Sequence, residues 1–377
     1  MGITSCTDAS RGIRRPDEHD APSPPTAPPR TAVTRELPTE SVVEHASAQV
    51  SFDAFARGAG VAATATSPLL TAPPAEAPRT PAQQRLDSYR AAYSGPYRVD
   101  GREVTASPQF RMAGGFNDAR ASLVTGKGID WASPQCREMA AICARAHVSL
   151  EALGHCLVGG PSARELRVVT QALIDAGKLP ASPGDLASRI KAMQWEHGVG
   201  IDCTDYAIGA AMAASGKTRS QIAIQAGKAT LPLPACDYFQ SADANQHLTR
   251  TDVTHARPGD VFCLDDPSGS VGHRAVVYSH KTLDAASVDA LAHGHGSIVS
   301  RFAAGGPVHA VEVDSSWGAG ESGASYGGVR RDTWLYNEST KQWAQLNQRK
   351  DTGQPPTFEL TPNGPADEKL HALYRFR

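Results

Sequence analysis

The stretch from Trp195 to Gly216, WEHGVGIDCTDYAIGAAMAASG, contains one cysteine at the start of an alanine-rich apolar segment. This pattern predicts a helix that begins near Cys203 and ends at Ser215-Gly216. A thiolate at a helix N-terminus is stabilised by unpaired backbone N–H groups and by the positive end of the helix dipole. We therefore expect Cys203 to be a nucleophile if the chain also supplies a base and a group that orients the base.

The composition excludes several classes of protein. The chain has 377 residues and a formal net charge of −2, which gives no electrostatic case for binding nucleic acid or an acidic membrane. Because it has neither an apolar run long enough to span a bilayer nor an apolar signal-peptide core, we expect a soluble protein without ordinary signal-peptide export. The seven cysteines are scattered without a C-x-x-C pair, so we expect no disulfide framework, metal or other cofactor.

The first part of the chain, residues 1–82, is rich in proline, serine, threonine and alanine. Such a segment buries too little apolar surface to offset its ordering entropy, so we expect it to be disordered. Its first six residues, MGITSC, offer Gly2 for myristoylation and Cys6 for palmitoylation, although the usual myristoylation motif has Ser or Thr at position six. Two acyl chains would give stable association with a membrane.

Residues 83–194 have a globular composition and predict a helical subdomain. A proline directly after Ser133 indicates one helix start, and a capping box from Ser162 to Glu165 indicates another. The sequence Ser-Pro-Gly-Asp before Leu186 indicates a third. These helices lead directly into the cysteine helix.

Residues 195–377 predict a second domain, in which the cysteine helix is followed by a β-sheet. Tight turns between the β-branched runs favour antiparallel pairing. The predicted strands are residues 261–264, 272–278, 308–313 and 328–335. The chain is therefore expected to have an α+β fold, with a helical N-terminal subdomain packed on an antiparallel sheet.

Cys203, His273 and Asp314 are the strongest candidates for catalysis. A cysteine nucleophile needs an imidazole to take its proton, and the imidazole needs a polar partner that fixes its tautomer. His273 opens one predicted strand and Asp314 ends another, so adjacent antiparallel strands can bring the two side chains to one face. His293 and His295 lie in a glycine-rich segment without a third ligand, so we expect a loop there and not a metal site.

The segments around these residues resemble the NlpC/P60 branch of the papain-like cysteine peptidases. That family has its nucleophile in a Gly-x-Asp-Cys-Ser-Gly-type box, and residues 200–206 read GIDCTDY. A Pro-Gly-Asp turn before a strand follows, here residues 258–260, and then a Gly-His-x-x-x-Tyr-type strand, here GHRAVVY at residues 272–278. The resemblance covers about residues 195–335 and implies a papain-like fold in which the cysteine and the histidine are nucleophile and base.

The chain departs from the family pattern at two places. Thr204-Asp205 replaces the usual Ser-Gly, and an insertion at about residues 281–306 separates the histidine strand from the next one. The insertion affects the third catalytic position, for which the candidates, in order, are Asp314, His309 and His280.

The resemblance also implies an oxyanion hole. Its first donor would be the backbone N–H of Cys203. Papain-like enzymes take the second donor from a glutamine upstream of the nucleophile, so Gln194 or His197 would supply it here.

The implied activity is that of a cysteine peptidase or amidase that works through a thioester at Cys203. Transglutaminase-like acyltransferases and deamidases share the Cys–His–Asp order and the thioester, so the sequence leaves them open. A non-catalytic binding module with a papain-type fold is a further alternative, because of the departure at Thr204-Asp205 and the insertion.

The expected substrate and location follow from residues 1–82, which we call the leader. NlpC/P60 enzymes commonly cut peptide bonds in the bacterial cell wall, which would require export to the wall. A disordered leader with acylation candidates and no export signal instead resembles bacterial type III effectors, virulence proteins that are secreted by a non-Sec route into host cells. We therefore expect a host protein or peptide as substrate, at the host plasma membrane; without such delivery, we expect a cytoplasmic protein.

Overall fold

A computed structural model describes residues 78–111, 123–125, 128–181, 184–217, 248–265, 273–291, 296–317, 327–347, 357–361 and 369–376. All of these residues belong to one compact unit, whose main segment begins at Pro78. The predicted boundary between residues 194 and 195 therefore lies inside that unit. The acylation candidates Gly2 and Cys6 lie outside the described residues.

The helices begin where the sequence signals predict. Ser133 caps α2 with a proline at the first helical position, and Ser162 and Glu165 form the capping box of α4. Asp185 caps α5. Helix α1 begins just before the predicted start of the subdomain at residue 83. The helices in this part are α1 (Pro81–Tyr93), α2 (Pro134–Arg145), α3 (Leu150–Val158), α4 (Ala163–Asp175), α5 (Leu186–His197) and α6 (Cys203–Ser215).

The central sheet is antiparallel and has the strand order β11-β10-β9-β8-β7-β6-β12-β5. The four predicted strands correspond to β6, β7, β8 and β9. The strands are β5 (Leu248–Thr251), β6 (Val261–Asp265), β7 (Arg274–Leu283), β8 (Val308–Trp317), β9 (Gly328–Asn337), β10 (Trp343–Asn347), β11 (Thr357–Thr361) and β12 (Lys369–Phe376). A 3-10 turn, η2 (Val253–His255), precedes β6.

Smaller elements complete the described fold. Two short hairpins are formed by β1 (Tyr97–Val99) with β2 (Arg102–Val104) and by β3 (Val124–Thr125) with β4 (Gly128–Ile129). The insertion after the histidine strand contains the end of β7 and two helices, α10 (Ala285–Leu291) and α11 (Gly296–Ala303). The pair His293 and His295 lies outside the described residues.

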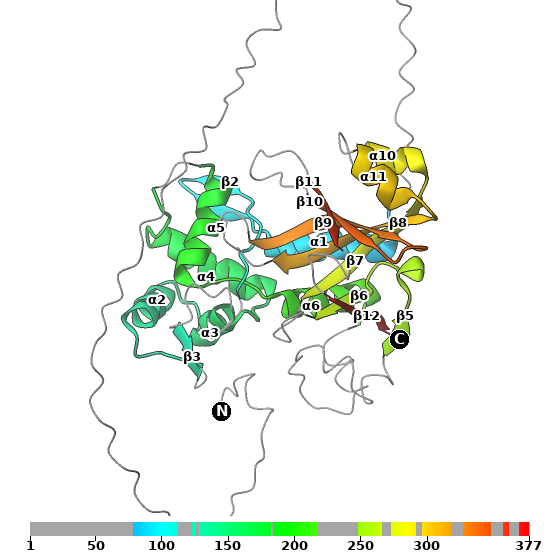
Figure 1. Ribbon diagram of the computed structural model, residues 1–377. Helices are drawn as coiled ribbons and strands as arrows, with labels where there is room; N and C mark the ends of the chain where they lie inside the picture. Colours follow the sequence, from blue (N-terminus) through cyan, green and yellow to red (C-terminus); the bar gives the residue numbers. More distant parts are fainter. Residues whose placement is uncertain are drawn as a thin grey trace, which may run out of the picture. The chain divides into compact units, whose positions relative to one another are not determined.

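The two faces of the sheet carry different buried clusters. On one face, which we call the α6 face, Val276 and Tyr278 join the core formed by the alanine-rich helix α6. On the other face, which we call the tryptophan face, Ala275 and Val277 pack in a cluster with Trp334. Figure 1 shows α6 beside the strands, with α2 to α5 gathered on its other side. The core therefore continues from the helices through α6 into the sheet.

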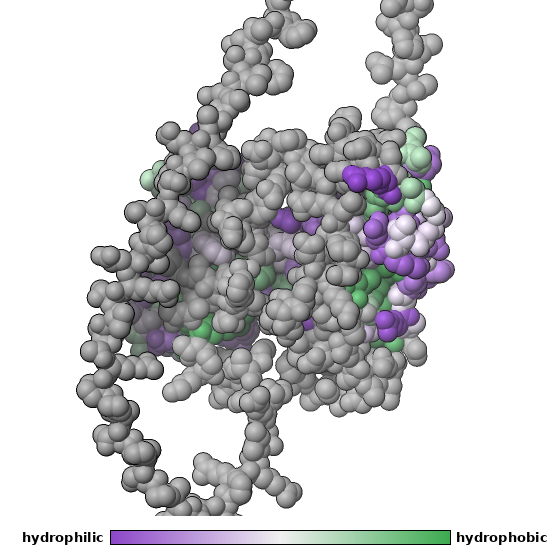
Figure 2. All heavy atoms as spheres, viewed as in Figure 1, coloured by the Kyte–Doolittle hydropathy of each residue, from purple (hydrophilic) through white to green (hydrophobic). Residues whose placement is uncertain are grey.

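Few large hydrophobic side chains are exposed on the described part of the chain. In Figure 2 hydrophilic and hydrophobic residues are mixed over the coloured part of the visible face. Among the described residues the exposed large hydrophobic side chains are Leu150 and Val158. None of the described helices combines the length and the apolar character that crossing a bilayer requires.

Candidate active site

Cys203 lies at the N-terminus of α6, where the backbone around it is firmly held. The carboxylate of Asp202, the N-cap residue, accepts a hydrogen bond from the backbone N–H of Asp205 at 2.6 Å. The hydroxyl of Ser316, near the end of β8, donates to the carbonyl of Ile201 at 2.8 Å. These bonds fix the start of the cysteine helix against the end of strand β8.

The Cys203 thiol is protonated at neutral pH, contrary to the expectation of a thiolate. Burial and the neighbouring carboxylate of Asp202 raise its pKa to about 11, while the Arg274 guanidinium, the Arg274 backbone N–H and the Thr204 hydroxyl lower it by less. The helix dipole favours a thiolate, but the side chain is only 4% exposed. Burial and the Asp202 carboxylate therefore outweigh both the Arg274 guanidinium and the favourable position at the helix end.

His273 immediately precedes β7, and its ring is fixed by two residues of β8. Its Nε2 lies 2.8 Å from the Oγ of Ser315, and the ring stacks on Trp317 with a centroid distance of 3.9 Å and an interplanar angle of 25°. Strand β7 pairs with β8 so that Val276 faces Asp314. Continuing that register places His273 opposite Trp317 and diagonal to Ser315, which explains both contacts.

The hydrogen bonds of Ser315 determine the tautomer of His273. The Ser315 hydroxyl donates its single proton to the backbone carbonyl of Arg274, which can only accept. Its oxygen must therefore accept from the Nε2–H of His273. In the neutral ring the lone pair is then on Nδ1, the nitrogen that a general base would use.

His273 is uncharged at neutral pH. Burial, and to a smaller extent the guanidinium groups of Arg274 and Arg330, together lower its pKa to about 3. The ring is 7% exposed. The resting site thus holds a neutral thiol and a neutral imidazole, not a thiolate–imidazolium ion pair.

Asp314 does not contact His273, so its predicted role as the third catalytic residue is not met. The nitrogens of Arg331 donate to the two Asp314 carboxylate oxygens, each at 2.7 Å, and Arg90 lies at 3.7 Å. Successive residues of a strand point to opposite faces, so Asp314 lies on the α6 face and Ser315 on the tryptophan face. Ser315 occupies the place predicted for Asp314, and the register of β7 with β8 is what identifies it.

Gln194 supports the site from behind and is not available as an oxyanion donor. Its Nε2 donates to the hydroxyl of Thr170 at 3.0 Å, and its Oε1 accepts from the backbone N–H of Gln109 at 2.9 Å. This arrangement presses the Gln109 backbone against Gly200, where an added Cβ would lie 2.3 Å from the Gln109 carbonyl oxygen. The glycine of the cysteine box is therefore required by this close approach.

The other predicted site residues also lie elsewhere. His197 ends α5 and contributes to the charge environment of Glu138 on α2. His309 Nδ1 lies 3.1 Å from His280 Nε2, and His309 Nε2 lies 3.2 Å from a carboxylate oxygen of Glu338. None of the three histidines reaches His273, so they do not complete the site.

Cys203, His273 and Ser315 converge on the backbone of Arg274. The N–H of Arg274 acts on the Cys203 thiol, and its carbonyl accepts from the hydroxyl of Ser315, which in turn binds His273. The side-chain hydrogen-bond partner of the thiol within the described part of the chain is Thr204, at an Sγ–Oγ1 distance of 4.0 Å. The thiol and the imidazole therefore share Arg274 as a neighbour, and no hydrogen bond joins the two side chains.

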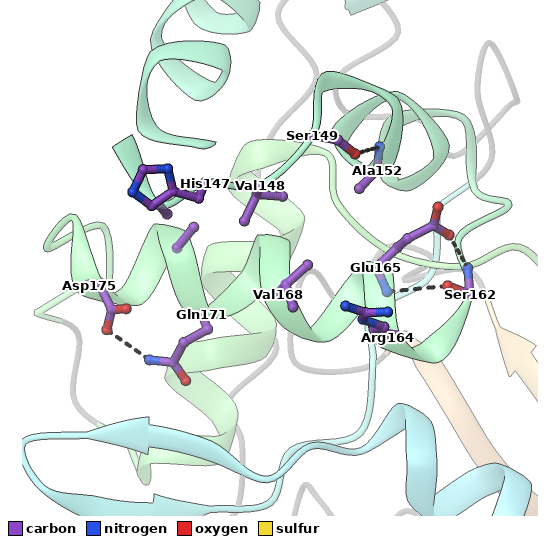
Figure 3. A pocket seen from close by; sticks show the side chains of 12 residues that line it. His147, Val148, Ser149, Ala152, Ser162, Arg164, Glu165, Val168, Gln171 and Asp175 are labelled. Atoms are coloured by element: carbon purple, nitrogen blue, oxygen red, sulfur yellow. Dashed lines mark hydrogen bonds between the residues drawn. The ribbon is translucent and has the colours of Figure 1, made fainter. Parts of the chain in front are cut away.

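The described helices also form a pocket, well separated in sequence from these residues. It has a volume of about 640 Å³ and lies between the turn that joins α2 to α3 and one side of α4. Figure 3 shows its polar residues at the rims, with Glu165 bound to Ser162 and Gln171 bound to Asp175. Its lining includes none of the predicted catalytic residues.

Comparison with known proteins adds no relationship: no family model, curated protein or solved structure matches the chain. Over the residues that the structure describes, no three His, Cys, Asp or Glu side chains are arranged to hold a metal ion. The function is therefore argued from the site itself.

Proposed function

We propose that the protein is a cysteine hydrolase, a peptidase or amidase that acts through a thioester at Cys203. The observation that carries this proposal is the convergence of Cys203, His273 and Ser315 on the backbone of Arg274. A nucleophile at a helix N-terminus, a base whose tautomer is fixed, and a polar group that orients the base are the parts that such chemistry needs. Ser315 takes the orienting role instead of Asp314.

The reaction follows from the proton positions in the resting site. Nδ1 of His273 takes the thiol proton as the sulfur of Cys203 attacks the carbonyl carbon and forms a carbon–sulfur bond. The imidazolium then gives this proton to the leaving amine as the carbon–nitrogen bond breaks. Water attacks the thioester and loses a proton to Nδ1; that proton returns to the departing sulfur, which leaves a carboxylic acid and restores the thiol.

Two features support the oxyanion and base roles. The backbone N–H of Cys203 is one of the N-terminal helix donors without an intrahelical acceptor, so it can bind the oxyanion of a tetrahedral intermediate. Trp317 covers the Ser315–His273 hydrogen bond by stacking on the imidazole, which shields that bond from water. The reaction requires Nδ1 of His273 and the sulfur of Cys203 to come within hydrogen-bond reach when substrate binds.

A papain-like fold of the NlpC/P60 type is part of the same proposal. It is supported by the order of the cysteine box, the Pro-Gly-Asp turn and the histidine strand, together with a cysteine helix that packs on an antiparallel sheet. Transglutaminase-like acyl transfer or deamidation shares the first half of this reaction. The fate of the thioester, attacked by water or by an amine, separates these activities.

The experiment uses 4-nitrophenyl acetate as a simple acyl donor. Attack by Cys203 releases 4-nitrophenolate and leaves an acetyl thioester, which mass spectrometry locates on the Cys203 peptide. We expect Cys203→Ala to abolish this label and His273→Ala to reduce it by about 100-fold or more. Cys263→Ala removes another buried thiol and serves as the matched control; wild-type labelling in His273→Ala would contradict the proposal.

A non-catalytic binding module is the second candidate. It is favoured by the raised pKa of Cys203 and by the missing hydrogen bond between thiol and imidazole. The same experiment decides between the two, because a binding module would show no preferential acylation of Cys203 in the folded chain.

The substrate and location remain proposals from the leader. A host protein at a host membrane, reached by a bacterial effector, fits an acylated Gly2 or Cys6. Gly2→Ala should shift the protein from the membrane fraction of host cells to the cytosol, with Ser5→Ala as the control. Unchanged fractionation of Gly2→Ala would remove myristoylation from the proposal.

A further inference from the structure

His280 on β7 and His309 on β8, which we call the histidine pair, are hydrogen-bonded to each other and have no part in the proposed reaction. Their rings are nearly parallel, with an interplanar angle of 14°, and His280 Nε2 lies 3.1 Å from His309 Nδ1. On its other side, His309 Nε2 lies 3.2 Å from a carboxylate oxygen of Glu338, which follows β9. Backbone from three neighbouring strands therefore fixes the order His280, His309, Glu338.

The carboxylate of Glu338 determines which ring nitrogens carry protons. An ionised carboxylate can only accept, so Nε2 of His309 carries a proton and donates it to Glu338. In the neutral His309 ring the lone pair is then on Nδ1, which accepts from the Nε2–H of His280. The Thr282 hydroxyl, 3.4 Å from the same Nδ1, can donate there as well. Each ring of the neutral pair thus has one defined tautomer.

The histidine pair can bind one proton without losing its hydrogen bond, but not two. With one added proton, one of the two facing nitrogens still has a lone pair and accepts. With two, both facing nitrogens are N–H donors and two cations meet at 3.1 Å. Burial and the neighbouring rings of His309 and His255 lower the pKa of His280. The fold therefore favours the uncharged ring, and this contribution is lost as the pH falls below the unfolded value near 6.5.

The surrounding charges offset a second proton only weakly. Glu338 contacts the pair, but 46% of its side chain is exposed, so water screens its charge. Asp252 is already balanced by Lys341 and His255. The other charged or titratable groups near the pair come from η2 and from β9 with the turn after it: Asp252, His255, Tyr336 and Lys341.

The histidine pair lies at the base of the helical insertion, residues 284–307. Strand β7 ends at Leu283 and β8 begins at Val308, and these two residues form the last pair of the ladder. The histidines occupy the positions just before this end, where Thr282 faces His309. Their hydrogen bond therefore joins the two strands at the point where the chain leaves the sheet and returns to it.

The insertion has few other attachments in the described part of the chain. Side chains of α10 and α11 pack with the sheet in a small cluster that is separate from the larger cores. The Asn337 side chain donates to the carbonyl of Phe302 at 2.5 Å, and the backbone N–H of Glu338 donates to that of Pro307 at 3.0 Å. A segment held in this way can open while the rest of the chain stays folded.

We infer that the histidine pair is a pH-sensitive contact that holds the helical insertion on the sheet. Its hydrogen bond closes the end of the β7–β8 ladder at neutral pH. In acid, protonation of both rings breaks this bond and releases α10 and α11. The contact is independent of the chemistry proposed at Cys203, because it lies at the opposite end of β7 and β8 from His273 and Ser315.

Hydrogen–deuterium exchange of the full-length chain, followed by mass spectrometry, tests this inference. Exchange is measured at about pH 7.5 and about pH 5, and each rate is divided by the intrinsic amide rate at that pH. We expect the protection of the α11 peptide to fall by about 10-fold or more in acid. Protection of the α4 peptide should stay the same, which separates local opening from unfolding of the whole unit.

Two variants assign the response to the pair. The side-chain amide in His280→Gln can donate to His309 Nδ1 or accept from it and does not titrate, so α11 should be equally protected at both pH values. His155→Gln is the matched control, because it removes a histidine that pairs with Glu165 at α4. This variant should keep the wild-type acid response at α11.

Three outcomes would overturn the inference. The first is equal protection of α11 at both pH values in the wild-type chain, and the second is an unchanged acid response in His280→Gln. The third is an equal fall in α4, which would show that acid unfolds the whole unit. Ring-nitrogen NMR shifts of the histidine-labelled wild-type chain give a check without a variant: at neutral pH, a proton on Nδ1 of His309 would also refute the inference.

Discussion

Asp314 and Ser315 are neighbours on β8, yet their two faces of the sheet surround them in opposite ways. On the α6 face, Asp314 is held by Arg331, which also contacts Asp87 of α1 at 3.1 Å. On the tryptophan face, Ser315 binds an uncharged imidazole. On the α6 face the polar residue of β8 is therefore bound by a charged group, whereas on the tryptophan face, which also holds the Arg330–Asp332 ion pair, it is bound by a neutral ring.

Neighbouring residues of β8 therefore have different roles, since Asp314 belongs to a stabilising ion-pair network and Ser315 to the candidate active site. The charged network connects α1 to β7, β8 and β9, because Arg331 also lies over the ring of Tyr278 with its Cζ 3.1 Å from the ring centroid. A buried ion pair costs desolvation unless its bonds are well made, and this pair has two. Ser315 and His273 are instead joined by a hydrogen bond between uncharged groups, which fixes the tautomer of the ring.

The largest effect on stability is expected on the α6 face. Arg331→Met leaves the fully buried Asp314 without its main partner and should lower the free energy of unfolding by about 3 kcal/mol, measured by urea denaturation. Arg79→Met breaks only the exposed pair with Asp87 and should cost less than about 1 kcal/mol. Equal losses in the two variants would contradict a larger contribution of the buried Arg331–Asp314 pair than of the exposed pair.

The pH dependence of the free energy of unfolding should report the buried, uncharged side chains of His273 and Cys203. The folded-state pKa of His273 is lowered to about 3, so its contribution is complete above the unfolded value near 6.5 and is lost as pH falls toward 3. The pKa of Cys203 is raised to about 11, so its contribution is complete below the unfolded value near 9 and is lost as pH rises toward 11.

Urea denaturation from pH 4 to 10 therefore should give a maximum between about pH 6.5 and pH 9. In His273→Asn the loss of stability on the acidic side should be smaller, and in Cys203→Ala the loss on the alkaline side should be smaller. An acidic limb of the same depth in His273→Asn would show that other groups cause it.

Ser315→Ala should act on chemistry more than on folding. It removes the acceptor for Nε2–H of His273 and frees the tautomer, so acylation of Cys203 by 4-nitrophenyl acetate should slow by about 10- to 100-fold. Ser315→Thr keeps the hydroxyl and should restore most of the rate. If Ser315 had only a structural role, Ser315→Ala and Ser315→Thr would change stability, and the pH profile of the acylation rate would stay the same.

The smallest effect is expected at Thr204. Its hydroxyl is the weakest of the groups that lower the pKa of Cys203. Thr204→Val should raise that pKa slightly, which a pH profile of iodoacetamide labelling would detect. A fall in the pKa would contradict the assignment of Thr204 as a donor to the sulfur.

Much of the fold could be predicted because its signals are local. Proline after Ser133, the capping box from Ser162 to Glu165 and the alternating runs each depend on a few adjacent residues, and the corresponding helices and strands are present. The start of α6 at Cys203 followed from the alanine-rich apolar segment that begins there. These elements do not depend on knowing the partners in space.

The site was predicted less well because it depends on register and on burial. Asp314 and Ser315 follow one another directly after the same β-branched run. Only the pairing of β7 with β8 shows which of the two shares a face with His273. Gln194 looked available until its partners Thr170 and Gln109 were known. The raised pKa of Cys203 reflects tertiary burial, which the helix position alone does not reveal.

The pairing of β7 with β8 shifts between Val277 and Ser279, which leaves Tyr278 as an extra residue in β7. A deletion of one residue normally inverts the facing of every side chain beyond it in a strand. At this bulge two residues of β7 oppose one of β8, so removal of Tyr278 would leave a regular ladder in which Ser279 still pairs with Glu312 and the second half of β7 keeps its facing. For protein engineering, the bulge is therefore the position in β7 where the spacing between His273 and the helical insertion can be shortened by one residue without changing the pairing of the other residues.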